Sequence, residues 1–102
     1  MTKYLTVVVC LLAVSGHVQA DEEGKTLFTA GAKPIACAVC HTLADAGSAG
    51  AIGPNLDELQ PSKEQILKVM QEGMGAMPSF AESLTDEERD AIATYVSSVV
   101  GQ

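Results

Sequence analysis

The sequence predicts a small all-α domain, and three observations support this fold class. Ser62 with Gln65, and Thr85 with Glu88, form capping boxes, which mark the first residues of helices. Apolar residues recur at helical spacing after each box. No segment alternates apolar and polar residues as a half-buried strand would. We therefore expect helices joined by loops, and no segment that reads as an alternating strand.

Residues 1–20 have the pattern of a secretory signal peptide. Lys3 gives a basic start, the run 4–14 is apolar and uncharged, and small residues lead up to Ala20. The run is shorter than the about 20 apolar residues that span a bilayer. We expect cleavage after Ala20, a periplasmic mature domain of residues 21–102, and no stable membrane insertion after cleavage. An uncleaved anchor is the alternative.

The first helix of the mature chain is expected over 22–32. Leu27 and Phe28 share one of its faces, and Gly24 would let another backbone approach closely. The second and third helices are expected over 62–72 and 86–99, after the two capping boxes. Their apolar stripes are formed by Ile66, Val69, Met70, Leu84, Ile92, Val96 and Val99, with Ala91 and Tyr95 beside the last stripe.

Two segments between these helices are expected to be functional loops. Residues 34–60 are rich in Gly, Ala, Ser and Pro, and so long a loop in a small domain is usually functional. Residues 73–80 contain Gly73, Gly75 and Pro78, which forbid a regular helix.

The first loop contains the motif Cys37-Ala38-Val39-Cys40-His41, which has the Cys-x-x-Cys-His spacing of a covalent haem attachment site. Residues three apart on a helical turn share a face, so both thiols can add to the vinyl groups of one haem. His41 follows directly, and its imidazole is a strong axial ligand for iron. The chain has two Tyr, two Phe and no Trp, so a haem would also supply a missing part of its interior.

Other chemistry uses the same two cysteines. A thioredoxin-like redox pair expects a strand–helix–strand setting, which the sequence lacks. A zinc site needs four ligands, but the mature chain offers only Cys37, Cys40 and His41 from the usual set of Cys and His. A structural disulfide suits an oxidising compartment but leaves His41 without a role. We therefore expect one covalent c-type haem.

The second axial ligand must come from elsewhere in the chain and cannot be a second histidine, because His17 is removed with the signal peptide and His41 is the only mature histidine. The candidates are Met70, Met74 and Met77. We favour Met77, with Met74 next, because Pro78 stiffens the Gly-rich stretch that carries it. A thioether is a soft neutral ligand that raises the reduction potential relative to a second imidazole.

The stretch Gly53-Pro54-Asn55-Leu56 lies between the two expected ligands. It is either an ordinary turn or a loop whose Pro54 carbonyl accepts a hydrogen bond from His41 Nδ1. The second arrangement would fix the imidazole ring and raise its donor strength.

The chain resembles the class I cytochromes c in their small bacterial monohaem form, over nearly all of residues 21–102. The resemblance rests on Gly24 with Leu27 and Phe28, the haem motif at Cys37, Cys40 and His41, the loop at Gly53–Leu56, Met77-Pro78, and Ile92, Tyr95 and Val96. It implies an all-α fold wrapped round one haem with a single exposed edge. The haem motif is highly specific, whereas the helices are much less so.

A narrower resemblance concerns residues 41–47 and 53–59, which are similar to the cytochrome subunits of bacterial sulfite dehydrogenases. It implies that a molybdenum-cofactor subunit donates electrons to the haem. The main alternative is a generic periplasmic carrier.

The chain has 13 acidic against 6 basic residues, which argues against nucleic acid as a partner. Apolar residues are expected to flank the haem edge, namely Ala38, Val39, Ala51, Ile52, Ala76 and Pro78. Such a patch in an acidic field suits brief encounters with a basic redox partner. The expected function is one-electron transfer and not catalysis; the alternative is a peroxidase-like enzyme or gas sensor with an open sixth iron position.

Overall fold

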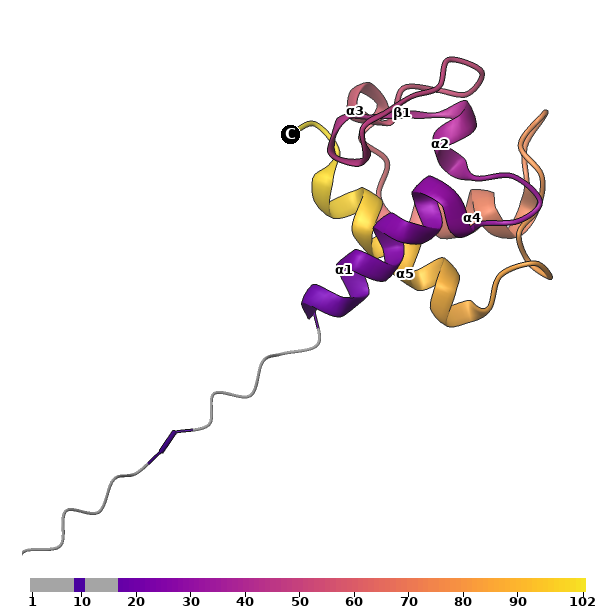
Figure 1. Cartoon of the computed structure of the whole chain (residues 1–102). Coiled ribbons are helices and arrows are strands. Elements are labelled where there is room, and N and C mark those ends of the chain that lie inside the picture. Colours follow the sequence, from indigo (N-terminus) through magenta and orange to yellow (C-terminus); the bar gives the residue numbers. More distant parts are fainter. Residues whose placement is uncertain (1–8, 11–16) are drawn as a thin grey trace, which may run out of the picture.

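Two helices from opposite ends of the chain cross at the centre of the fold (Figure 1). They are α1 (His17–Thr26) and α5 (Asp86–Val99), in a computed structural model that describes residues 9–10 and 17–102. Gly24 lies at the crossing, where a Cβ would stand only 2.9 Å from the backbone carbonyl carbon of Ala91 and 2.6 Å from Tyr95 Cβ. The close backbone approach expected at Gly24 is therefore confirmed.

The first helix differs from its expected bounds at both ends. It begins at His17 and not at residue 22, and after Thr26 it widens into a π-helical turn, η1 (Leu27–Gly31). Phe28 in this turn is buried, and its ring meets that of Tyr95 edge-on at 6.3 Å between centroids. Most of the expected signal peptide, 1–20, lies outside the described residues, and the expected cut after Ala20 falls within α1.

The helices α4 (Lys63–Glu72) and α5 begin as the sequence predicts. Ser62 Oγ accepts from Gln65 N at 3.2 Å while Gln65 Oε1 accepts from Ser62 N at 2.8 Å. Thr85 and Glu88 exchange the same pair of bonds at the start of α5. Gly73 ends α4 with a φ of 70°, a conformation that a side chain would strain.

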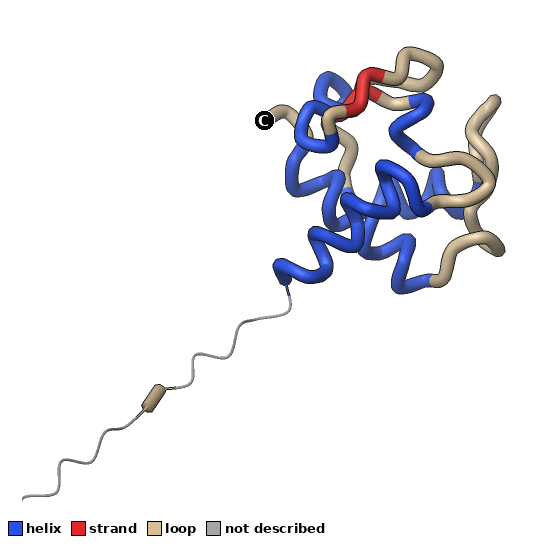
Figure 2. The backbone as a smooth tube through the Cα atoms, viewed as in Figure 1, coloured by secondary structure: helices blue, strands red, loops and turns tan. Residues whose placement is uncertain are grey.

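The segment 34–60 holds more regular structure than the sequence suggests. It contains α2 (Cys37–Cys40), β1 (Thr42–Leu43), the 3₁₀ turn η2 (Ala44–Ala46), β2 (Ser48–Ala49) and α3 (Leu56–Leu59). The two strands pair antiparallel, with Thr42 opposite Ala49 and Leu43 opposite Ser48 (Figure 2). Nothing in the sequence indicated these strands, because two-residue strands are too short to show alternation.

The core lies between the crossed terminal helices and α4. Its buried apolar residues are Phe28, Ala32, Leu43, Ile66, Met70, Phe80, Leu84, Ile92, Ala93, Tyr95 and Val96. Cys37, Ala38 and Met77 are partly buried and pack against this cluster. The core therefore reaches the two loops that carry the expected haem ligands. None of the described helices has the length and apolar character needed to cross a membrane.

Candidate functional site

A single helical turn carries the two cysteines of the motif. In α2, the backbone N–H of His41 donates to the Cys37 carbonyl at 2.9 Å, which places Cys37 and Cys40 three residues apart on one face. The chain then becomes extended at His41, with φ −112° and ψ 140°. The residue that carries the imidazole therefore directly follows the helical turn that carries the two thiols.

The His41 ring is held by the loop 53–54. Its Nδ1 lies 2.8 Å from the Pro54 carbonyl oxygen. Because a carbonyl can only accept, Nδ1 carries the hydrogen, and in the neutral imidazole Nε2 then keeps its lone pair. The backbone of Gly53 packs on the same ring, and a Cβ there would stand 2.6 Å from His41 Cε1. The stretch that the sequence left open as a turn therefore orients a histidine whose second nitrogen can bind a metal.

Gly50 is a site residue that the sequence analysis missed. A Cβ at this position would lie 2.6 Å from the Val39 carbonyl oxygen and 2.7 Å from His41 N. The Gly50 carbonyl accepts a hydrogen bond from Thr42 Oγ1 at 2.9 Å. The loop therefore lies directly against the backbone of the Cys-x-x-Cys-His turn. The loop contains several glycines, so the sequence did not distinguish Gly50 as the one that contacts this turn.

The methionine loop makes a tight turn. Met74 and Met77 exchange backbone hydrogen bonds of 3.0 and 2.9 Å around Gly75, whose φ is 55°. Met74 is 75% exposed, whereas Met77 is partly buried against the core and Met70 is 2% exposed within it. Of the three candidates, Met77 alone is both beside the core and on a loop.

Burial raises the pKa of the Cys37 thiol to about 11, with a smaller increase from the nearby Cys40 and an opposing backbone hydrogen bond. The thiol is therefore protonated at neutral pH, unlike the low-pKa cysteine of a thioredoxin-like pair. Cys37 and Cys40 are not joined by a disulfide. Within 9–10 and 17–102, no three His, Cys, Asp or Glu side chains are grouped to hold a metal ion.

Most of the apolar rim expected around the haem edge is exposed. The exposed members are Val39, Ala51, Ile52 and Ala76, while Ala38 and Pro78 are half-buried. The side chains of Met74 and Ile35 are also exposed, and the sequence analysis did not include them. Val39 and Ile52 are 53% and 73% exposed, so these large apolar side chains are available to a partner.

These features fit a covalent haem. Two neighbouring thiols, a histidine with an unbonded Nε2, and a methionine beside an apolar core are the donor set of a c-type haem. The glycines at 50 and 53 keep the surrounding backbone close to the motif. Fold and site together define the class of the c-type cytochromes.

Comparison with known proteins agrees with this class. The family model described as cytochrome C oxidase, cbb3-type, subunit III matches residues 19–96. A crystal structure of the c-type cytochrome SorU from Sinorhizobium meliloti is similar, with 46% sequence identity and a TM-score of 0.78. The match covers 83% of this chain and 95% of that one. Curated proteins give no significant match. The chain belongs to this family of cytochrome c domains.

Proposed function

We propose that the protein carries single electrons on one haem, bound through thioethers at Cys37 and Cys40 and ligated at iron by His41 and Met77. The orientation of His41 is the observation that carries this proposal. Its Nδ1 is engaged by Pro54 O at 2.8 Å, and its Nε2 is unbonded directly after a Cys-x-x-Cys turn. When bound, the haem supplies a reversible one-electron redox couple.

The residues of the chain have separate tasks in this proposal. The two thioethers retain the haem, and the Pro54 carbonyl fixes the His41 tautomer and makes Nε2 a stronger donor. Met77 offers a neutral sulfur that favours the reduced iron. The partly buried position of Met77 supports it over Met74, which is 75% exposed.

Electron transfer is better supported than catalysis at an open iron. A peroxidase-like site needs a distal acid–base group, and His41 and Arg89 are the only His and Arg in residues 21–102. Nδ1 of His41 is bound to Pro54, and the Arg89 guanidinium donates to backbone carbonyls and pairs with Asp86. Neither group is free to protonate a bound substrate.

The remaining parts of the proposal concern location and partners. We propose that residues 1–20 are a signal peptide removed after Ala20 and that the domain 21–102 works in the periplasm. Its donor is a molybdenum sulfite dehydrogenase, as the loops 41–47 and 53–59 suggest. Docking would use the exposed side chains of Val39 and Ile52, with the formal net charge of −7 of the whole chain attracting a basic partner.

Met77→Ala tests the ligation. The variant should lose the weak absorption band at the red end of the oxidised spectrum that marks an iron–methionine bond, and its reduction potential should fall. Met74→Ala is the matched control, because Met74 lies opposite Met77 in the same turn. Retention of the band in Met77→Ala, with its loss in Met74→Ala, would contradict the assignment.

A further inference from the structure

Arg89 is the one charged side chain that is buried in the described part of the chain, with 8% exposure. It is also the only arginine in the sequence. It stands in the charged run Asp86–Asp90 at the start of α5, which a sequence pattern would assign to solvent. Burying a guanidinium is unfavourable unless its donors are satisfied. The hydrogen-bond and ion-pair partners of the Arg89 guanidinium therefore indicate why this side chain is buried.

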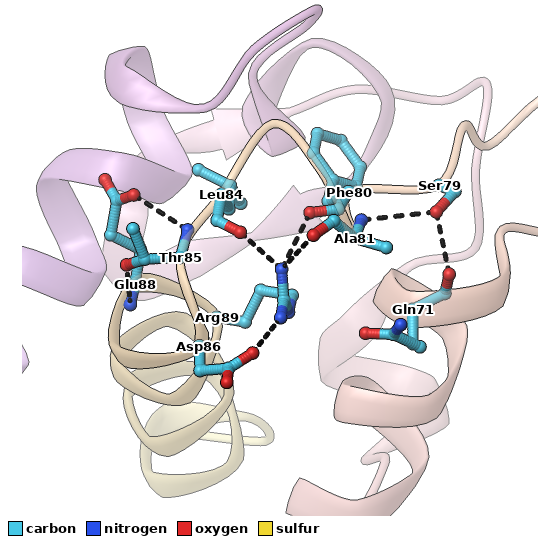
Figure 3. Close-up of polar contacts among 9 residues, drawn as sticks. All are labelled: Gln71, Ser79, Phe80, Ala81, Leu84, Thr85, Asp86, Glu88 and Arg89. Carbon is cyan, nitrogen blue, oxygen red and sulfur yellow. Dashed lines mark hydrogen bonds and ion pairs between the residues drawn. The ribbon is translucent and has the colours of Figure 1, made fainter.

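The guanidinium joins the backbone turn 80–84 to α5 by hydrogen bonds (Figure 3). Nη1 lies 3.0 Å from the Phe80 carbonyl oxygen and 2.8 Å from that of Ala81, and it also contacts the Leu84 carbonyl. Nη2 pairs with the carboxylate of Asp86. One side chain thus contacts three carbonyls of the turn, and the Phe80 carbonyl also accepts from Leu84 N at 3.2 Å.

The same segment is held from the opposite side by α4. Phe80 N donates to the Met70 carbonyl at 2.7 Å, and Ser79 Oγ donates to the Gln71 carbonyl at 2.7 Å. Ser79 Oγ also accepts from Ala81 N at 3.2 Å. The peptide groups of Phe80 are therefore fixed to α4 through the nitrogen and to α5 through the oxygen.

We propose that Arg89 is the positioning residue for Met77. Only Pro78 and Ser79 separate Met77 from the carbonyl of Phe80 that Arg89 holds. The fixed φ of Pro78 makes that connection stiff, so the place of Phe80 determines how far the Met77 sulfur can move. The inference rests on the proposed iron ligation by Met77.

A guanidinium is suited to this task and an ammonium is not. Its planar fork presents several N–H donors in fixed directions, so it can serve two or three carbonyls and a carboxylate together. A lysine at 89 keeps the charge but presents a single flexible point donor. Arg89→Lys should therefore remove guanidinium donors from the carbonyls of the turn 80–84 while changing the charge of the protein little. The Phe80 carbonyl would keep only its bond from Leu84 N and would lose its link to Arg89 in α5.

The experiment uses the haem-loaded protein with Arg89→Lys. Hydrogen exchange at the Phe80 amide should become about tenfold faster or more, since one lost hydrogen bond to a charged group corresponds to at least that factor. In a urea titration, the iron–methionine band should disappear at a lower urea concentration than the helical circular dichroism. In the parent protein the two transitions should lie closer together.

Tyr95→Phe is the matched control, because it removes a hydrogen bond between α5 and the distant Asp45 and leaves the turn 80–84 intact. In this variant the iron–methionine band and the helical circular dichroism should be lost at the same urea concentration, which should be lower than in the parent protein. The Phe80 amide should exchange no faster than global unfolding allows. If Arg89→Lys behaves in the same way, Arg89 is merely structural and the inference is refuted.

Two further variants separate the possible failures. If Arg89→Lys yields no folded protein, Asp86→Asn weakens the same guanidinium from its other nitrogen, and Phe80 exchange should rise about threefold; unchanged exchange would refute the inference. If Met77→Ala retains the band, the proposed ligation fails and the inference with it. If Met77→Ala loses the band but Arg89→Lys matches Tyr95→Phe, only the role of Arg89 is wrong.

Discussion

Replacing Gly24 by alanine should force α1 and α5 apart at their crossing. The new Cβ would stand 2.6 Å from Tyr95 Cβ and 2.9 Å from the carbonyl carbon of Ala91. Non-bonded carbons prefer about 3.5–4.0 Å, so the helices must separate by about 1 Å. The Ala91 atom belongs to the backbone and cannot rotate away, and Tyr95 is fully packed in the core.

Two opposing contributions set the magnitude. Alanine in place of glycine inside a helix is favourable by about 0.5–1 kcal/mol. Overpacking a tight contact costs about 1–3 kcal/mol, and the edge-on contact of Phe28 with Tyr95 is worth about 0.5–1.5 kcal/mol if it is lost. The balance is a destabilisation of about 1–3 kcal/mol, which in a domain of this size lowers the midpoint of thermal unfolding by roughly 4–24 °C.

Urea and thermal unfolding of the haem-loaded protein, followed by circular dichroism, would measure this change. Gly31→Ala is the matched control, since the nearest atom to its Cβ would be the flexible tip of Leu27, at 3.0 Å, and the Thr26 carbonyl oxygen would lie at an ordinary contact distance of 3.6 Å. That variant should be nearly neutral. Equal stability of Gly24→Ala and the parent protein, or a gain in stability, would show that the helices do not approach as closely as the structure indicates.

Two further predictions concern the tyrosine at the helix crossing and the haem. Tyr95→Phe should cost about 1–2 kcal/mol, because the hydroxyl donates to the Asp45 carboxylate at 2.5 Å. Burial, and then the bond to Asp45, raise the pKa of Tyr95 well above its usual value, so this stability is fully present below pH about 10 and is lost as the pH rises further. The difference in the free energy of unfolding between the parent protein and Tyr95→Phe, measured in urea, should therefore narrow above pH about 10. A difference that widens would contradict the bond from Tyr95 to Asp45. Replacing Cys37 and Cys40 together by alanine should give a largely disordered apoprotein, because the core has few aromatic residues; a cooperative thermal transition without haem would disprove this.

The parts of the fold that depend on local interactions could be predicted from the sequence. The capping boxes at Ser62 and Thr85 each join groups three residues apart, and both helices begin where these boxes place them. Gly73 ends α4 for an equally local reason, its positive φ. Such features are determined within one turn of chain, so no knowledge of the rest of the molecule is required.

The short elements between residues 42 and 59 were missed. The hairpin of β1 and β2 places Leu43 in the core, where it is completely buried, and no pattern of four residues announces this. The short helix α3 had a usable signal, since Asn55 caps it by accepting from Asp57 N at 3.0 Å. An asparagine at the cap with two acidic residues in the first turn is a common helix start. From the sequence, Asn55 was expected only in a turn or in a loop that holds His41.

The histidine side and the methionine side of the candidate site differ in how far the sequence could predict them. On the histidine side, Cys37, Cys40 and His41 are adjacent in the chain, so their chemistry is visible in the sequence. On the methionine side, the loop ends at a peptide fixed by Met70 from α4 and by Arg89 from α5. A charged run gives no sign that one of its members is buried. Because both anchors belong to helices of the core, we expect the position of Met77 to depend on core packing, whereas that of His41 depends mainly on its own loop.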